Sequence, residues 1–183
     1  MLILNFEKFP VLETERLTLR PISIDDVDEM FQQRSNPDVM KYIVRPLLQS
    51  RREAEELVRN YEFLFEQGIS ITWAISLKGE SKMLGTVGFP RINKENYRGE
   101  IGYSLDPVNW NKGYMSEALK EIIQFGFKQL RMNTIEAVIH PENRASSSLM
   151  LKHGFVREAY FREHTFFDGR FQDVEIYSLL SPR

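Results

Sequence analysis

One turn in the chain combines a glycine, a lysine and the start of a helical pattern, which together suit the binding of phosphate. Asn111, Lys112, Gly113 and Ser116 follow a strand-like segment, residues 100–105. The first backbone N–H groups of a helix lack intrahelical partners, and the helix dipole leaves partial positive charge there. Because Gly113 has no Cβ, a phosphate can approach this backbone closely, with Lys112 as counter-charge. The turn predicts a pyrophosphate cradle, although a plain strand-to-helix connection has the same pattern.

The hydrophobic pattern on either side of this turn predicts a strand–helix–strand unit. Apolar residues recur at i, i+3, i+4, i+8 and i+11 along one helical face, and a buried strand follows at Thr134–Ile139. We expect the two strands to be parallel and joined by a right-handed crossover. The cradle then lies at the carboxyl end of a strand, where open α/β sheets bind ligands. The apolar helix positions are Leu119, Ile122, Ile123, Phe127 and Leu130.

The rest of the chain predicts further strands and helices around this unit. Alternation predicts a half-buried strand at Glu15–Ile22, and Ser23–Asp26 and Ser50–Glu53 have the pattern of helix starts. Further signals are an antiparallel meander of three strands over 69–105, a short helix with Asn143 as N-cap, and a final hairpin over 155–180. The sequence therefore predicts an α/β (mixed α+β) fold. Its mixed, mostly antiparallel sheet has about seven strands, with helices on both faces.

The composition of the chain excludes several classes of protein and of site. At 183 residues the chain fits one domain, 1–183, and a net charge of −2 gives no general attraction to nucleic acid or to a membrane. With no cysteine there is no Cys nucleophile, disulfide or Cys–zinc site, which suits the cytoplasm. The N-terminus lacks the basic region and cleavage site of a signal peptide. His140, His153 and His164 have no metal-ligand spacing, so we expect no metal.

Three parts of the chain share a pattern with a known family: Leu12–Arg20 with Asn36–Tyr42, then Glu100–Pro107 with Trp110–Ala118, and finally Asn143–Ser146 with Lys152–Phe155. Together they resemble the GNAT superfamily of acetyl-coenzyme A-dependent N-acetyltransferases, and within it the ribosomal-protein N-terminal acetyltransferases of the Rim type. The resemblance extends over about residues 11–181. The loop departs from the usual family pattern at two positions: Trp110 stands where a basic or amide residue is usual, and Met115 where a second small residue is usual.

The resemblance implies a GNAT-type acyl-CoA N-acyltransferase fold and transfer of acetyl from acetyl-CoA directly to a primary amine. The most favoured acceptor is the N-terminal α-amine of a protein or peptide. The resemblance also implies that the edge of the strand Ile101–Leu105 pairs with pantetheine, and that the family's frequent homodimer is an assembly to expect. The implied coenzyme-binding residues are Ile101, Tyr103, Leu105, Asn111, Lys112, Gly113, Tyr114, Met115, Ser116, Asn143 and Ser146.

Acetyl transfer to an amine also needs a base and a group that stabilises the leaving thiolate. Glu100 is the candidate base, directly or through water, and it can equally be a solvated carboxylate at a strand end. Glu163 and His164 are reserve bases. The resemblance implies that the Ser146 hydroxyl faces the coenzyme sulfur, where it stabilises the thiolate; otherwise Ser146 is an ordinary residue of a helix start.

Two alternatives remain open at the level of sequence. The acceptor can be a small molecule such as an amino acid, a polyamine or an antibiotic amine. The same fold can also hold an acyl-CoA without catalysis, as a sensor or scaffold.

Overall fold

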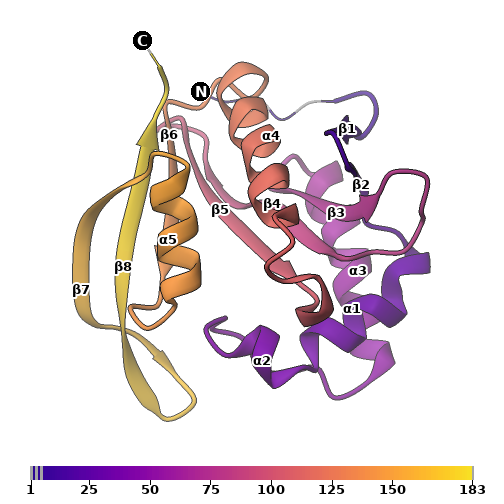
Figure 1. Cartoon of the computed structure of the whole chain (residues 1–183), viewed down its shortest axis with the longest axis horizontal. Helices are drawn as coiled ribbons and strands as arrows, with labels where there is room; N and C mark the ends of the chain where they lie inside the picture. Colours follow the sequence, from indigo (N-terminus) through magenta and orange to yellow (C-terminus); the bar gives the residue numbers. More distant parts are fainter. Residues whose placement is uncertain (1, 3, 5, 183) are drawn as a thin grey trace.

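The computed structural model describes residues 2, 4 and 6–182, and these fold around one eight-stranded sheet (Figure 1). The helices are α1 (Val27–Arg34), α2 (Pro37–Met40), α3 (Arg51–Glu66), α4 (Tyr114–Lys128) and α5 (Arg144–Lys152). The strands are β1 (Leu12–Glu13), β2 (Leu17–Pro21), β3 (Ile71–Leu77), β4 (Gly85–Asn93), β5 (Arg98–Leu105), β6 (Thr134–Ile139), β7 (Val156–Phe167) and β8 (Arg170–Leu180).

The strand order β1-β2-β3-β4-β5-β6-β8-β7 confirms the predicted mixed, mostly antiparallel sheet. β3, β4 and β5 form the expected meander, β7 and β8 form the final hairpin, and β5 and β6 are the parallel pair around α4. The sheet has one strand more than expected. The additional strand is β1, which pairs with β2 through only two residues. Two residues are too few for an alternating pattern to be visible in the sequence.

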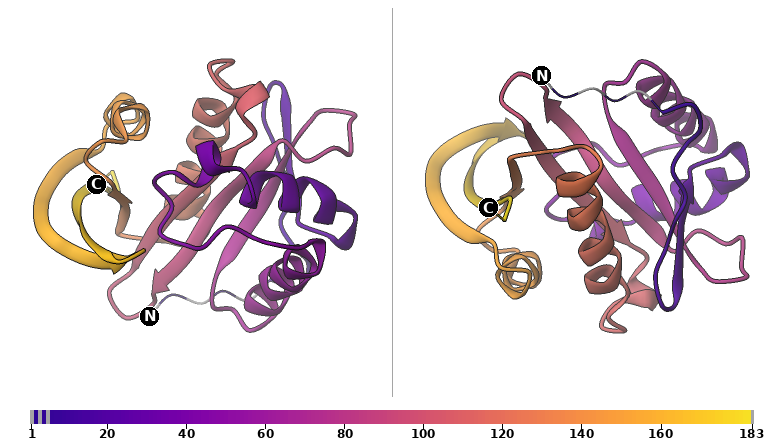
Figure 2. Two further views of the ribbon diagram at one scale, coloured as in Figure 1. Left: turned by 90° about the horizontal axis from the view of Figure 1, so that it is seen from below. Right: turned by 90° about the horizontal axis from the view of Figure 1, so that it is seen from above.

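β5 and β6 pair over only a short part of their length. The pairs are Arg98 with Thr134, Gly99 with Ile135 and Glu100 with Glu136, whereas β5 continues to Leu105 and β6 to Ile139. Beyond Glu100 the two strands therefore diverge, and the β6-facing edge of β5 has no partner strand. Figure 2 shows the result: the ribbons of α5 and of the β7–β8 hairpin lie apart from that of the meander. We call the place between residues 101–105 of β5 and the first turn of α5, where strand pairing has stopped, the opening of the sheet.

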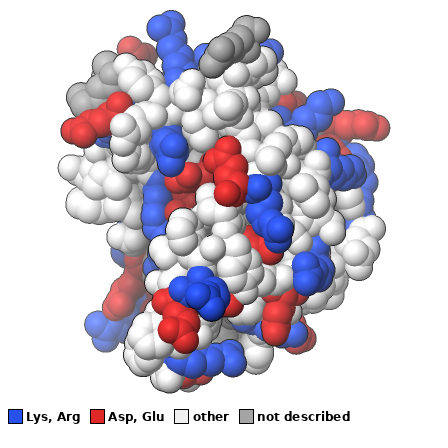
Figure 3. Space-filling view, turned by 90° about the vertical axis from the view of Figure 1, so that its left-hand side faces the viewer, with Lys and Arg blue, Asp and Glu red and all other residues white. Residues whose placement is uncertain are grey.

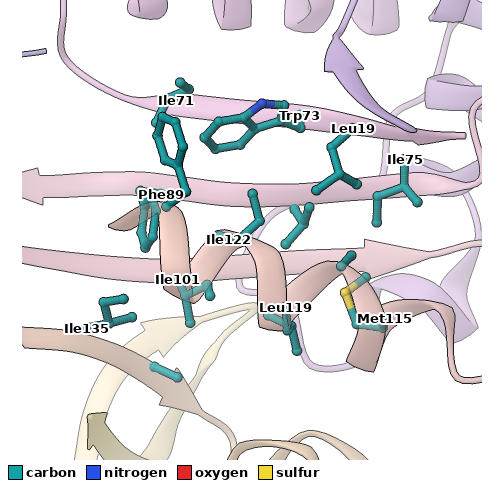
Figure 4. Packing of buried hydrophobic residues seen from close by; sticks show 14 of the residues in the cluster. Leu19, Ile71, Trp73, Ile75, Phe89, Ile101, Met115, Leu119, Ile122 and Ile135 are labelled. Atoms are coloured by element: carbon teal, nitrogen blue, oxygen red, sulfur yellow. The ribbon is translucent and has the colours of Figure 1, made fainter. Parts of the chain in front are cut away.

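The larger core lies between the sheet and α4. Met115, Leu119 and Ile122 recur along one face of α4 and pack on Trp73 and the neighbouring strands (Figure 4). This is the helical periodicity expected from the sequence. The strand residues in contact with this face include Ile71, Ile75, Phe89, Ile101 and Ile135. The packing fixes α4 against β5, and so places the loop between them.

A second core covers the opposite face of the sheet. Val27 and Met30 of α1 and Ala54 and Val58 of α3 pack against Ala74 of β3. The predicted helix starts are confirmed: Ser23 and Asp26 form the capping box, and the Ser50 side chain accepts a hydrogen bond from the backbone N–H of Glu53.

The surface and the helices add two further observations. Acidic and basic side chains are interspersed on the face that β7 and β8 present, as Figure 3 shows. Among the described residues, no helix is both long and apolar enough to cross a membrane.

Candidate active site

The predicted cradle, residues 111–116, extends from the loop after β5 into the first turn of α4, and its backbone N–H groups have no protein partners among the described residues. Gly113 is the N-cap of α4 at φ 81°, and Asn111 is also left-handed at φ 60°. No side chain caps this helix, and within the described chain none of the six N–H groups from Asn111 to Ser116 donates a hydrogen bond to the protein. Successive unpaired N–H groups at a helix start make a binding site for an anion.

Arg16, at the start of β2, holds this loop from the side. Its Nη1 donates to the carbonyl oxygen of Lys112 at 3.0 Å, and its guanidinium lies 4.7 Å from the centre of the Tyr114 ring. Its Nε donates to Glu117 of α4 at 2.7 Å. The sequence did not point to this contact, because Arg16 looks like an ordinary exposed residue of a strand and lies far from the loop along the chain.

Glu117 of α4 connects the loop between β1 and β2 to the start of α4. Its carboxylate accepts hydrogen bonds from Thr14 Oγ1 at 2.5 Å and from the backbone N–H of Arg16 at 2.7 Å. Burial alone raises the pKa of the Glu117 carboxyl, but the hydrogen bonds from Thr14 and Arg16 outweigh it and the net pKa is lowered. Glu117 is therefore a charged anchor between the β1–β2 corner and the first turn of α4.

The two departures from the usual loop pattern leave the cradle open. Met115 is buried and packs in the core, so its side chain points away from the N–H groups (Figure 4). The indole N–H of Trp110 donates to the carbonyl oxygen of Leu105 at 2.9 Å and thereby closes the end of β5. Lys112 is exposed, and its Nζ lies 3.4 Å from Asn109 Oδ1.

β5 contributes a free edge and one side chain that reaches α5. Ile101 and Leu105 are buried in the core, while the β6-facing edge from Ile101 onward has no strand partner in the part of the chain that the structure describes. The Tyr103 hydroxyl lies 2.6 Å from Ser146 Oγ, so the two residues meet across the opening. Burial raises the pKa of Tyr103 to about 12, although the hydrogen bond to Ser146 acts in the opposite direction.

α5 begins as predicted. The Asn143 side chain accepts a hydrogen bond from the backbone N–H of Ser146 at 3.2 Å, which confirms the N-cap. A second contact links α5 to α4: Ser116 Oγ lies 3.0 Å from His153 Nε2. Burial and the neighbouring Lys152 lower the pKa of His153, so a neutral imidazole is favoured there.

Glu100 is the last residue of β5 that pairs with β6, and so it lies where the two strands begin to diverge. Its Oε1 accepts a hydrogen bond from Arg91 at 2.5 Å, and it stands beside Glu136 in the strand register. Glu136 in turn is paired with Arg98 at 3.2 Å. These four residues line an open groove of about 600 Å³. The sequence singled out Glu100 but gave no sign of its neutralising arginine or of the second carboxylate.

The reserve bases lie on the exposed hairpin. The backbone N–H of Glu163 donates to Asp173 at 2.8 Å, and the ring of His164 lies 5.3 Å from that of Phe161. Both side chains are exposed, and no hydrogen bond joins either of them to Glu100 or Ser146 within the described residues. The described residues also contain no group of three or more His, Asp or Glu side chains placed to hold a metal ion.

A model of the acetyltransferase (GNAT) domain matches residues 16–156, most of the chain. This protein belongs to the GNAT acetyltransferase family. Two relatives from Bacillus cover the chain almost completely. The uncharacterized N-acetyltransferase YoaA of Bacillus subtilis is 33% identical over 96% of this chain and 99% of its own length. The uncharacterized N-acetyltransferase p20 of Bacillus licheniformis is 37% identical over 92% and 95%. Family and relatives together make this GNAT protein an acetyltransferase.

Solved structures agree with the fold. An acetyltransferase of the GNAT family from Bacillus anthracis superposes with a TM-score of 0.83 at 28% identity, over 93% of this chain and 98% of that one. RimL, a ribosomal L7/L12 α-N-protein acetyltransferase solved with coenzyme A, superposes with a TM-score of 0.85 at 20% identity, over 94% and 98%. The predicted family is confirmed by these matches.

The narrower Rim branch has weaker support. The ribosomal-protein-serine acetyltransferase of Escherichia coli is 25% identical over 131 residues, which is 72% of each chain. The two Bacillus relatives are more similar to this chain, and their names specify no acceptor.

Proposed function

We propose that this GNAT enzyme transfers acetyl from acetyl-CoA directly to the N-terminal α-amine of a protein or peptide. The observation that carries the proposal is the convergence on one opening of three features: the unpartnered N–H groups of the cradle, the free edge of β5, and the hydroxyl of Ser146. Acetyl-CoA needs each of them, for its diphosphate, its pantetheine arm and its sulfur.

The residues fit the coenzyme. The N–H groups of Asn111–Ser116 hold the diphosphate, Lys112 adds a positive charge, and Arg16 keeps the loop in place. A Cβ on Gly113 would lie 3.3 Å from Arg16 Nη2 and would require an L-residue in a left-handed conformation. The backbone of Ile101–Leu105 pairs with pantetheine as an added strand would, and Asn143 lies at the opposite lip of the opening. The bound thioester supplies the acetyl group as an electrophile.

Glu100 is the base in this proposal, directly or through one water molecule. An α-amine has a reference pKa of about 8, so a weak base suffices near neutral pH. Arg91 neutralises the carboxylate in the free protein, and the recorded hydrogen bond engages Oε1 only. A cationic amine that enters the groove between Glu100 and Glu136 competes with Arg91 for the same charge. Proton removal then accompanies attack on the acetyl carbon.

Ser146 stabilises the leaving group. A thiol has a pKa of about 8.5, far below that of a serine hydroxyl, so Ser146 donates a hydrogen bond to the thiolate and keeps its own proton. Direct transfer to the amine requires no covalent acyl-enzyme. The acceptor is a protein or peptide in this proposal because of the resemblance to the Rim branch and the named activity of the Escherichia coli relative.

The test is an acetylation assay that detects released CoA thiol. Purified protein and acetyl-CoA are offered a peptide that begins with serine, the same peptide with a blocked N-terminus and a free lysine, and a set of polyamines and amino acids. We expect turnover with the free α-amine alone. The E100Q and S146A variants should lose rate, by about 10²-fold for E100Q, and still bind CoA. Turnover with small amines alone would show that the acceptor is a small molecule and not a protein or peptide. No turnover on any amine would overturn the proposal.

A further inference from the structure

The hydroxyl groups of two neighbouring serines on α5 take different partners. Ser147 Oγ donates to the carbonyl oxygens of Asn143 at 3.4 Å and Arg144 at 3.2 Å, which is the common local bond of a serine in a helix. Ser146 Oγ makes no such bond to the described residues, and it lies 2.6 Å from the Tyr103 hydroxyl of β5. Both serines thus lie beside a tyrosine of the sheet, Ser147 beside Tyr177 of β8 and Ser146 beside Tyr103 of β5, but only Ser147 also donates to the α5 carbonyls.

Chemistry assigns the direction of this hydrogen bond. A phenol is far more acidic than an aliphatic hydroxyl, so it is the better donor. Burial raises the pKa of Tyr103 to about 12, which keeps its proton in place at every pH where the enzyme would work. From these acidities we infer that Tyr103 donates and Ser146 Oγ accepts across the 2.6 Å contact. The hydrogen of Ser146 remains free for another acceptor.

The backbone N–H and the side-chain oxygen of Ser146 both take part in hydrogen bonds. Its backbone N–H donates to the Asn143 side chain at 3.2 Å, and its oxygen accepts from Tyr103. Tyr103 belongs to the part of β5 beyond Glu100, where β6 no longer pairs with the strand. The Tyr103–Ser146 contact therefore spans the opening itself, from β5 to the first turn of α5.

We propose that Tyr103 is a positioning residue, whose phenol holds the Ser146 hydroxyl away from the α5 carbonyls so that its hydrogen is directed to the coenzyme sulfur. The inference rests on the proposed function. In the transfer step the amine nitrogen bonds to the acetyl carbon and its proton passes to Glu100 or water. The C–S bond breaks, and its electron pair stays on sulfur as the thiolate, which accepts the Ser146 hydrogen bond. In this proposal the backbone of Tyr103 belongs to the strand edge that pairs with pantetheine, whereas its phenol contacts no reacting atom and acts only through Ser146.

The kcat and KM of variants of the full chain distinguish a positioning role of Tyr103 from a purely structural role. We expect Y103F to lower kcat about ten-fold with an unchanged KM for acetyl-CoA, because Ser146 then loses the contact that directs its hydrogen to the developing thiolate. S146A should lose at least as much, and the double variant should be no slower than S146A alone. The control is Y177F, which removes the hydroxyl that Tyr177 donates to Glu175 at 2.8 Å on β8, and S147A controls for the serine. Both should keep the parent kcat.

The thiol pKa of bound CoA is a second measurement, and it requires no turnover. It is obtained by titration, with the ultraviolet absorbance of the thiolate as the signal. The parent should lower this pKa from about 8.5, and Y103F and S146A should each return it upward by about one unit without adding in the double variant. Three results would each overturn the inference. The first is a Y103F enzyme with the kcat of the parent, the second is a double variant in which the two effects multiply, and the third is a loss of CoA affinity in Y103F. A parent that turns over no amine would instead overturn the proposed function, and the thiol titration would still report on Tyr103.

Discussion

The helices on the two sides of the opening, α4 and α5, begin in opposite ways. α5 begins with Asn143, whose side chain accepts the N–H of Ser146, as Ser50 does for Glu53 at the start of α3. α4 begins with Gly113, which has no side chain to offer, and its first N–H groups have no protein partner in the described chain. Capping is worth about 1 kcal/mol, so an uncapped helix start forgoes stability. In the proposed function, α5 therefore presents a side chain to the substrate, whereas α4 presents its backbone.

The largest effect should come from G113A. Alanine at φ 81° is strained, and its Cβ would crowd Arg16 Nη2 in the cradle. We expect CoA to bind at least about ten-fold more weakly by calorimetry, since each lost hydrogen bond to a charged group is worth about 1.5–3 kcal/mol. Gly79, at φ 80° with nothing within 4 Å, provides the matched control. G79A should lose similar stability, about 1 kcal/mol, with no change in CoA affinity. Equal CoA affinities for G113A and G79A would remove the special role of the α4 start.

N143A tests the other side of the comparison. We expect a loss of about 1 kcal/mol in the free energy of unfolding, because the cap on the Ser146 N–H is removed. S50A removes the equivalent cap from α3 and should cost about the same. Denaturant unfolding measures both, and the acetylation assay separates them: kcat should fall in N143A alone. Equal activity of the two variants would show that Asn143 serves the helix and not the substrate.

The pH dependence of stability tests the anchor at the start of α4. The pKa of Glu117 is lowered in the folded protein, so its stabilisation is present above the ordinary value of about 4.3 and is lost as pH falls through the lower folded pKa. E117Q should therefore have a lower Tm than the parent at pH 7, and this gap should close below about pH 4. Scanning calorimetry across this range is the measurement. The control is E121Q, which changes a carboxylate on the same helix that makes no hydrogen bond in the described chain, and its Tm at pH 7 should stay close to that of the parent. A flat gap for E117Q would contradict the anchor.

The smallest effect should come from K112A. Lys112 is exposed, and its charge is screened by solvent and salt. We expect CoA affinity to fall about three-fold at low ionic strength, and the difference from the parent to shrink at high salt. K120A, on the exposed side of α4, is the control and should bind CoA like the parent. A loss as large as that of G113A would move the main diphosphate contact from the backbone to the Lys112 side chain.

The sequence predicted the parts of the site that depend on local pattern. The crossover around α4, the cap at Asn143 and the position of Gly113 all follow from residues within a few positions of one another. The Tyr103–Ser146 and Arg91–Glu100 contacts could not be predicted in this way. They depend on where β5 and β6 diverge and on the register of β4 against β5, which no local pattern encodes. Arg16 is the clearest case, because it acts on a loop that lies 96 residues away along the chain.

The central claim is that the unpartnered N–H groups of residues 111–116 hold the diphosphate of the coenzyme. An NMR titration of the ¹⁵N-labelled protein tests it most directly, with CoA in one series and pantetheine, which lacks the diphosphate, in the other. We predict that the amide signals of Gly113–Ser116 shift strongly with CoA and hardly with pantetheine, while signals along Ile101–Leu105 respond to both. Amide signals at 111–116 that stay in place while CoA binds would contradict the account.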